Sequence, residues 1–149
     1  MRFEEEIEIS ASPEKVFSLY QAVSAWQAWD PDVERASIDG PFVAGAVGRL
    51  KPSGAPESRI IFTDVVPDVS FSVECRLPLC SMRFEHELSR ASSGTRALHR
   101  VSFLGPLAWF FGRVIGSKIR QGLPGTLRGL KTAAESARSS EPTPPLGAT

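Results

Sequence analysis

His86 and His99 are the two histidines of this chain and the residues best suited to proton chemistry, because imidazole titrates near neutral pH. Both lie in stretches that alternate apolar and polar residues, as strands do. A two-residue hairpin loop at Pro78-Leu79 places Phe71 opposite His86, and a turn at Ser92-Ser93 places His86 opposite His99. We therefore expect two adjacent imidazoles in an apolar wall.

Three interpretations of these imidazoles are open, because a buried imidazole without hydrogen-bond partners costs a few kcal/mol. They bridge to each other or to water inside the core, they anchor the polar group of a bound ligand, or they act as general acid and base. In the last case His86 and His99 are the catalytic residues.

Cys75 and Cys80 raise the question of a zinc site, since cysteine and histidine are zinc ligands. Both cysteines stand well along the strands from the histidines, and no C-x₂-C pair is present, so we predict no metal. The thiols are most simply small apolar fillers. No G-x-S-x-G elbow, phosphate-binding glycine loop or acidic metal cluster is found, and we predict no cofactor.

The same strand register sends one set of side chains to a single face. On the opposite face it pairs Glu74 with Arg83 and Glu85 with Arg100, which supports the register because a slip of one residue would turn every apolar side chain outward. The inward set is Phe71, Val73, Cys75, Leu77, Cys80, Met82, Phe84, His86, Leu88, Ala97, His99, Val101 and Phe103.

The tryptophans allow more than one interpretation. Trp26 and Trp29 are three residues apart and share a helical face, either as core anchors or as part of a cavity mouth. Trp109, beside Phe110, makes the start of the last helix apolar almost all round. That surface is a mobile gate, a self-association surface, a membrane contact or a simple loop contact.

The elements that position these residues follow from periodicity. A strand at 3–9 precedes a helix opened by Ser12-Pro13 and a short helix carrying Trp26 and Trp29. About six strands fill 33–103, and a helical stripe from Leu107 to Ala134 should kink at Pro124. This predicts an α+β fold in which the long helix covers a curved antiparallel sheet and leaves a cavity. Residues 1–138 form the domain and residues 139–149 a disordered Pro-rich tail.

The composition of the chain makes some classes of function less fitting than others. With 149 residues and 17 Lys+Arg against 17 Asp+Glu, the chain fits one domain and lacks the basic charge typical of nucleic-acid binders. Residues 1–75 carry a balance of −7 and residues 76–149 one of +7, which predicts internal pairing rather than two charged poles. No targeting signal or membrane-spanning run is visible, so we expect a cytoplasmic protein without stable membrane insertion.

The order of several motifs resembles the START/Bet v 1-like (SRPBCC) superfamily, in particular its bacterial polyketide cyclase/dehydrase-type branch. They are Ile7-Glu8-Ile9, the segment 11–17, Trp26-Gln-Ala-Trp29-Asp30-Pro31, the segment 84–88, Gly94-Thr95-Arg96 and the segment 99–107. The resemblance implies a helix-grip fold, with a seven-stranded curved antiparallel sheet around a long C-terminal helix and two short helices at one end. It also implies a cavity for an apolar or aromatic small molecule.

The leading interpretation is a protein that binds a hydrophobic small molecule, lipid-like or polyketide-like, between the sheet and the C-terminal helix. The alternatives are a polyketide cyclase or dehydratase that uses the histidines, and a ligand-free protein-interaction module. A homodimer is also an open alternative. The expected ligand contacts are Trp26, Trp29, Phe71, Val73, Cys75, Met82, Phe84, His86, His99, Val101, Phe111 and Ile115.

Overall fold

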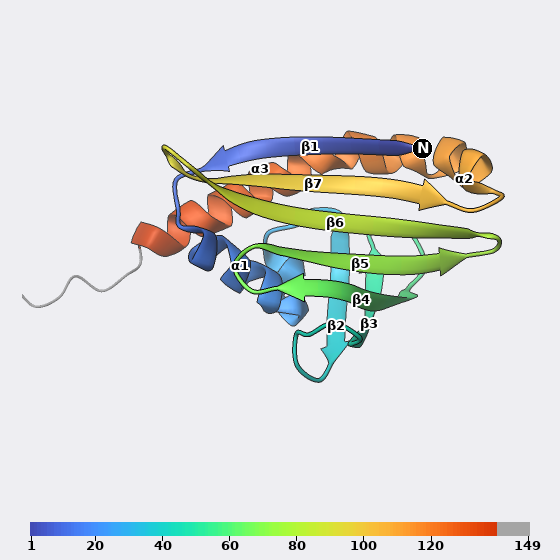
Figure 1. Ribbon diagram of the computed structural model, residues 1–149, viewed down its shortest axis with the longest axis horizontal. Helices are drawn as coiled ribbons and strands as arrows, with labels where there is room; N and C mark the ends of the chain where they lie inside the picture. The colour runs from blue at the N-terminus through green and yellow to red at the C-terminus, as the bar shows by residue number, and fades with distance from the viewer. Residues whose placement is uncertain (140–149) are drawn as a thin grey trace, which may run out of the picture.

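A seven-stranded antiparallel sheet with the last helix along one side dominates the computed structural model, which describes residues 1–139 (Figure 1). The strand order is β1-β7-β6-β5-β4-β3-β2. The elements are β1 (Arg2–Ile9), α1 (Pro13–Gln21), the 3₁₀ helix η1 (Val23–Ala28), β2 (Val33–Asp39), β3 (Val47–Pro52), β4 (Ser58–Val66), β5 (Ser70–Leu77), β6 (Cys80–Ala91), β7 (Gly94–Leu104), α2 (Ala108–Val114) and α3 (Gly116–Ser139). The predicted α+β helix-grip architecture is confirmed.

The predicted register of the three central strands is confirmed. Phe71 of β5 pairs with His86 of β6, and His86 pairs with His99 of β7. Leu79, the second residue of the two-residue loop between β5 and β6, has a positive φ of 53°, as the residue after the proline of a type II turn requires. Local turn chemistry therefore sets which side chains share the concave face.

The charged pairs predicted for the convex face form as expected. Arg100 of β7 contacts Glu4 and Glu85, and Arg83 contacts Glu74. Further pairs, Glu8 with Arg96 and Glu14 with Arg90, also join the acidic first half of the chain to the basic second half. Surface pairs of this kind stabilise by about 0–1 kcal/mol each, so they favour the register more than they hold the fold together.

The start of α1 follows its sequence signals. The Ser12 side chain accepts a hydrogen bond from the Lys15 amide, and Pro13 occupies the first helical position. The second tryptophan departs from the prediction, because η1 ends at Ala28 and Trp29 lies beyond it. Trp26 and Trp29 consequently meet different neighbours, Phe62 and Phe71 for Trp26 and Tyr20 for Trp29.

The C-terminal helix breaks at a position that the sequence prediction missed, and the predicted kink at Pro124 stays a prediction. The C-terminal helix is interrupted at Ile115, between α2 and α3, whereas α3 continues through Pro124. Gly112 and Gly116 flank the break, and each lies against a side chain from the end of the sheet, Met1 and Phe103 respectively. Glycine is a poor helix former and allows this close approach, so the helix changes course there. The predicted tail begins at Ser139, which ends α3, and residues 140–149 lie outside the described residues.

The interior contains two apolar clusters. The larger packs α1, η1 and α3 against β1 and β4–β6 and includes Tyr20, Trp26 and Phe71. The smaller lies near α2 and includes Val101 and Phe103. Met82 and Phe84 of β6 are partly buried and contact both clusters. Helix α3 itself runs mainly along β1, at one side of the sheet (Figure 1).

Candidate functional site: the aromatic and imidazole cluster on the concave face

The centre of the site is a hydrogen bond between α1 and the sheet. The Tyr20 hydroxyl lies 2.8 Å from Nε2 of His99, and both residues are buried. Tyr20 belongs to the buried face of α1 together with Val16 and Phe17, so packing of that helix carries the hydroxyl down to β7. The pair satisfies two polar groups that would otherwise lack partners in the core.

His86 stands beside this pair and is held by β5. Its ring stacks on the Phe71 ring with centroids 4.0 Å apart and an interplanar angle of 2°, and its Nδ1 lies 3.3 Å from the Phe71 carbonyl oxygen. The His99 ring meets it edge-on at 4.5 Å. A carbonyl can only accept, so Nδ1 carries the proton and Nε2 of the neutral ring is a hydrogen-bond acceptor.

All three groups of the cluster are uncharged at neutral pH. Burial lowers the pKa of His86 to about 4, even though its Nδ1 contact favours the protonated form. Burial, and after it the neighbouring His86, lowers the pKa of His99 well below its ordinary value. Burial raises the pKa of Tyr20, which therefore keeps its proton. The cluster is thus a set of hydrogen-bonding dipoles rather than of charges.

The concave face stays accessible over β6. Met82, Phe84 and His86 point inward yet are only partly buried, whereas Phe71, Val73 and Cys75 opposite them on β5 are buried. In the described part of the chain Nε2 of His86 makes no hydrogen bond, and it is not among the fully enclosed polar atoms that lack a partner. Nε2 therefore presents an accessible acceptor within apolar surroundings.

Trp29 adds a donor at the edge of the cluster. Its ring lies 6.2 Å from the Tyr20 ring, and its Nε1 is one of two enclosed side-chain polar atoms without a partner among the described residues. An indole N–H donates only, so it requires an acceptor that residues 1–139 do not supply.

The segment after Trp29 is clamped onto α3, which fixes the indole. Thr126 Oγ1 donates to a carboxylate oxygen of Asp30 at 2.9 Å, and the Asp32 amide donates to the same side chain at 2.9 Å. Burial raises the pKa of Asp30, while these two hydrogen bonds oppose that shift. One partly buried carboxylate oxygen, Oδ1 of Asp30, accepts both hydrogen bonds and so joins the Trp29–Asp32 turn to the helix.

The twelve predicted ligand contacts fall into two groups by burial. Partly exposed are Trp29, Met82, Phe84, His86, Phe111 and Ile115. Enclosed by protein are Trp26, Phe71, Val73, Cys75, His99 and Val101. Phe111 belongs to the smaller apolar cluster, and Ile115 lies at the junction of α2 and α3, so both are nearer the α2 end than the imidazoles.

Two hollows on the surface differ from the predicted internal cavity. One of about 300 Å³ lies at the loop between β5 and β6 and is lined by residues such as Arg76, Leu79 and Leu104. Another of about 520 Å³ lies where the loop between β6 and β7 meets the start of α1. Neither includes a histidine, so the accessible surface over β6, and not these hollows, is the candidate ligand site.

The two cysteines stay apart from the imidazoles. Cys75 pairs in register with Met82, Cys80 pairs with Leu77, and both thiols are free and buried. Burial raises the pKa of Cys75, which disfavours a thiolate. Within residues 1–139 no three His, Cys, Asp or Glu side chains are grouped as metal ligands.

Tyr20 is the site residue that the sequence prediction missed. Periodicity places it only on the apolar stripe of α1, although it is the single tyrosine of the chain. A tyrosine on a buried helical face must find a partner for its hydroxyl, and the two inward histidines were the available polar groups. That reasoning could have paired Tyr20 with a histidine, but it could not have chosen between His86 and His99.

A protein-family model matches the sequence over most of its length. The family model described as "Polyketide cyclase / dehydrase and lipid transport" matches residues 1–135. This chain belongs to that family. A search of the curated proteins found no match. In the described residues, no helix has both the length and the apolar character needed to cross a bilayer.

Solved structures share the fold at low sequence identity. TTHA0849 from Thermus thermophilus has a TM-score of 0.73 at 13% identity, covering 92% of this chain and 99% of that one. Ara h 8.0201 has a TM-score of 0.68 at 16% identity, covering 91% and 98%. The di-domain ARO/CYC StfQ from the steffimycin biosynthetic pathway has a TM-score of 0.70 at 14% identity, covering 93% of this chain and 51% of its own. These similarities establish the fold and leave the ligand open.

Proposed function

We propose that the protein binds a hydrophobic, hydroxyl-bearing small molecule on the concave face of the sheet, over β6. The observation that carries the proposal is the accessible Nε2 of neutral His86, set among the partly exposed Met82 and Phe84. A single acceptor in an apolar surface orients a ligand hydroxyl, while the apolar area supplies affinity.

The unpartnered Trp29 N–H extends the description of the ligand. A ligand that also carries a carbonyl or ether oxygen would satisfy this donor if it displaced the side chains that enclose it. Planar polyketide-like molecules and sterols offer apolar surface together with hydroxyl or carbonyl oxygens, so this chemical class fits both groups. The Tyr20–His99 pair stands behind His86 and keeps that part of the wall polar but uncharged.

The low pKa of His86 favours binding over proton abstraction. A general base works best when its pKa lies near the working pH. An imidazole with a pKa of about 4 is unprotonated at neutral pH, but it holds an abstracted proton weakly. It is therefore better suited to accept a hydrogen bond than to remove a proton from carbon.

Paired ligands test the binding proposal. A hydroxylated polyaromatic probe and its unsubstituted parent hydrocarbon are titrated against the protein and against His86→Phe, which keeps a ring on Phe71 but has no acceptor. The wild type should prefer the hydroxylated probe by roughly three- to tenfold, the equivalent of one hydrogen bond, and the variant should lose this preference.

Glu87→Gln is the matched control, because Glu87 lies on the opposite face of β6 and pairs with Arg100. It should retain the preference. If a broad panel of apolar probes neither binds nor raises the melting temperature of the wild type, the proposal fails.

A cyclase or dehydratase is the second candidate, favoured by the accessible Nε2 of His86 close to the Tyr20–His99 pair. One imidazole would remove a proton from an activated carbon while a neighbouring donor stabilised the resulting oxyanion. His86→Ala should then abolish turnover of a polyketide-like substrate while binding changes only a few-fold. Unchanged turnover in that variant would remove His86 from the mechanism.

A further inference from the structure

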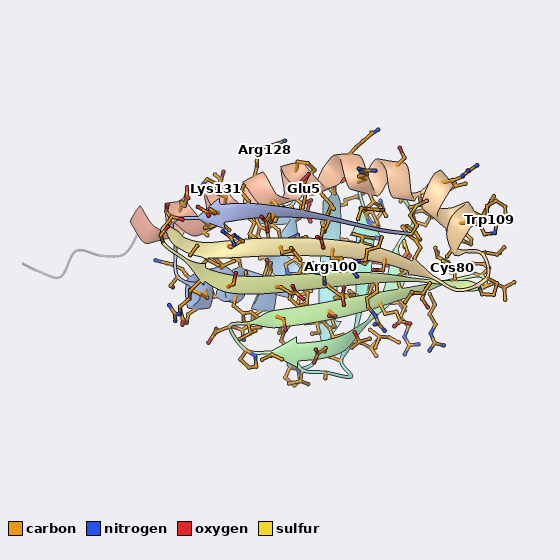
Figure 2. All side chains as sticks on the ribbon, turned by 45° about the horizontal axis from the view of Figure 1, so that its top comes forward. Glu5, Cys80, Arg100, Trp109, Arg128 and Lys131 are labelled. Atoms are coloured by element: carbon orange, nitrogen blue, oxygen red, sulfur yellow. The ribbon has the colours of Figure 1, made fainter. Side chains whose placement is uncertain are left out.

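The end of the molecule that carries α2 exposes large apolar side chains. Trp109 and Val114 are each 63% exposed and Leu79 is 68% exposed. We name the set Leu79, Leu104, Trp109, Phe110 and Val114 the aromatic tip. Figure 2 shows Trp109 at this end, beyond Cys80 and far from Lys131.

The aromatic tip is one structure and not a scatter of side chains. The Leu107 amide donates to the Leu79 carbonyl oxygen at 3.1 Å, which joins the loop between β5 and β6 to the start of α2. The Trp109 and Phe110 rings lie 6.1 Å apart. Phe110 and Val114 are four residues apart and share an exposed side of α2.

Positive charge without ion pairs lies in the elements that carry or adjoin the tip, namely the end of β5, α2 and the first turn of α3. Between Glu87 and Glu135 the chain has eight Lys and Arg and no Asp or Glu. Arg90 and Arg96, near the far end of the sheet, pair with Glu14 and Glu8. In the described part of the chain the exposed Arg76, Arg113, Lys118 and Arg120 have no ion pair; Glu74, beside the tip, pairs with Arg83.

We propose that the aromatic tip docks this protein peripherally on an anionic lipid bilayer. Indole and phenyl rings favour the interface between lipid and water, and basic side chains gain roughly fivefold in partitioning each near an anionic surface. With no helix among residues 1–139 suited to spanning, this contact lies on the bilayer and does not cross it.

The charge pattern opposes a second copy of the chain as the occupant. In a symmetric dimer through the aromatic tip, each protomer would bring Arg113, Lys118 and Arg120 toward the same residues of its partner. Like charges brought together across an interface are costly. An anionic bilayer can bind the apolar groups in its interface and the basic groups at its headgroups.

The tip also continues into the interior. The ring centroids of Phe110 and Phe111 lie 5.2 Å apart, and Phe111, like Met82 and Phe84, packs against the buried residues of the smaller cluster. An apolar molecule leaving a bilayer would therefore meet continuous apolar surface toward His86. This last link rests on the proposed ligand binding, whereas docking itself does not.

Vesicle flotation tests the proposal. The full chain is mixed with phosphatidylcholine vesicles with and without about one third phosphatidylglycerol, at about 0.1 M and about 0.5 M NaCl. We expect it to float only with the anionic vesicles and mainly at low salt. Trp109→Ser combined with Phe110→Ser should reduce the bound fraction at least tenfold, and so should Arg113→Gln, Lys118→Gln and Arg120→Gln together.

The matched charge control is Arg90→Gln, Arg96→Gln and Arg128→Gln, which removes the same charge away from the tip and should stay within twofold of wild type. An equal loss in this control, or no flotation of the wild type, would overturn the proposal. A dimer in light scattering that disappears in the Trp109/Phe110 variant would instead assign the tip to self-association. Titration of the hydroxylated probe without vesicles tests the ligand proposal separately.

Discussion

At the scale of single residues, the Tyr20 hydroxyl is the partner that allows His99 to be buried. Among residues 1–139 it is the only hydrogen-bond partner of the His99 ring, with the hydroxyl oxygen 2.8 Å from Nε2. Tyr20→Phe removes the partner and keeps the shape, so an imidazole nitrogen remains in the core without it. We expect the free energy of unfolding to fall by about 1–3 kcal/mol in urea titrations. A change below about 0.5 kcal/mol would mean that water replaces the hydroxyl.

The lowered pKa of His86 makes stability depend on pH. Folding lowers this pKa from 6.5 to about 4, so the unfolded chain takes up a proton first as the pH falls. The stabilisation is fully present above about pH 6.5 and is lost between pH 6.5 and pH 4. Linkage gives a loss of roughly 2 kcal/mol between pH 7 and pH 5 for this group.

Urea unfolding at those two pH values tests this expectation. The carboxylates titrate alike in the wild type and in His86→Phe, so the difference between the two proteins reports on His86 together with its effect on the pKa of His99. The variant should lose less stability on acidification than the wild type does. An identical pH dependence would mean that His86 titrates normally in the folded state.

At the scale of elements, the glycines of α3 let the Trp29–Asp32 turn lie directly on the helix. A Cβ at Gly129 would overlap the Trp29 carbonyl oxygen, which is backbone and cannot swing away. A Cβ at Gly125, one turn earlier on the same face, would meet nothing closer than 3.8 Å. Both positions are helical, so alanine gains helix propensity at each and meets a steric obstacle at one.

Gly129→Ala should therefore destabilise the protein by about 2 kcal/mol or more, whereas Gly125→Ala should be neutral or stabilise it by up to about 1 kcal/mol. Thermal unfolding of the two variants measures this difference. Because the obstacle at Gly129 is the Trp29 carbonyl, Gly129→Ala should also weaken probe binding over β6 if the Trp29 N–H contacts the ligand. Equal stability of the two variants would show that the turn shifts freely.

At the scale of the whole molecule, the net charge is zero but the charged side chains are unevenly distributed. The predicted internal pairing is confirmed for Arg90, Arg96 and Arg100, which meet acidic groups of α1, β1 and β6. The predicted pairing does not form at the α2 end, where Arg113, Lys118 and Arg120 make no ion pair among the described residues.

The unpaired basic residues near α2 predict that the protein is retained on a cation exchanger at pH 7 and low salt, although its formal net charge is zero. The Arg113/Lys118/Arg120 glutamine variant should elute clearly earlier than the Arg90/Arg96/Arg128 variant, although both remove three positive charges. Elution salt concentration is the measurement. Co-elution of the two variants would mean that net charge alone governs retention.

The sequence alone determined the strand register, the inward set from Phe71 to Phe103 and the family, because alternation and turn chemistry act between close neighbours in the chain. Only the tertiary structure decided that Tyr20 pairs with His99 and leaves Nε2 of His86 accessible, since this depends on how α1 docks on the sheet. It also decided where the last helix breaks, because Gly112 meets Met1, and Gly116 meets Phe3 as well as Phe103, at the start of the sheet. Such meetings are set by the packing of distant elements, which no local pattern encodes.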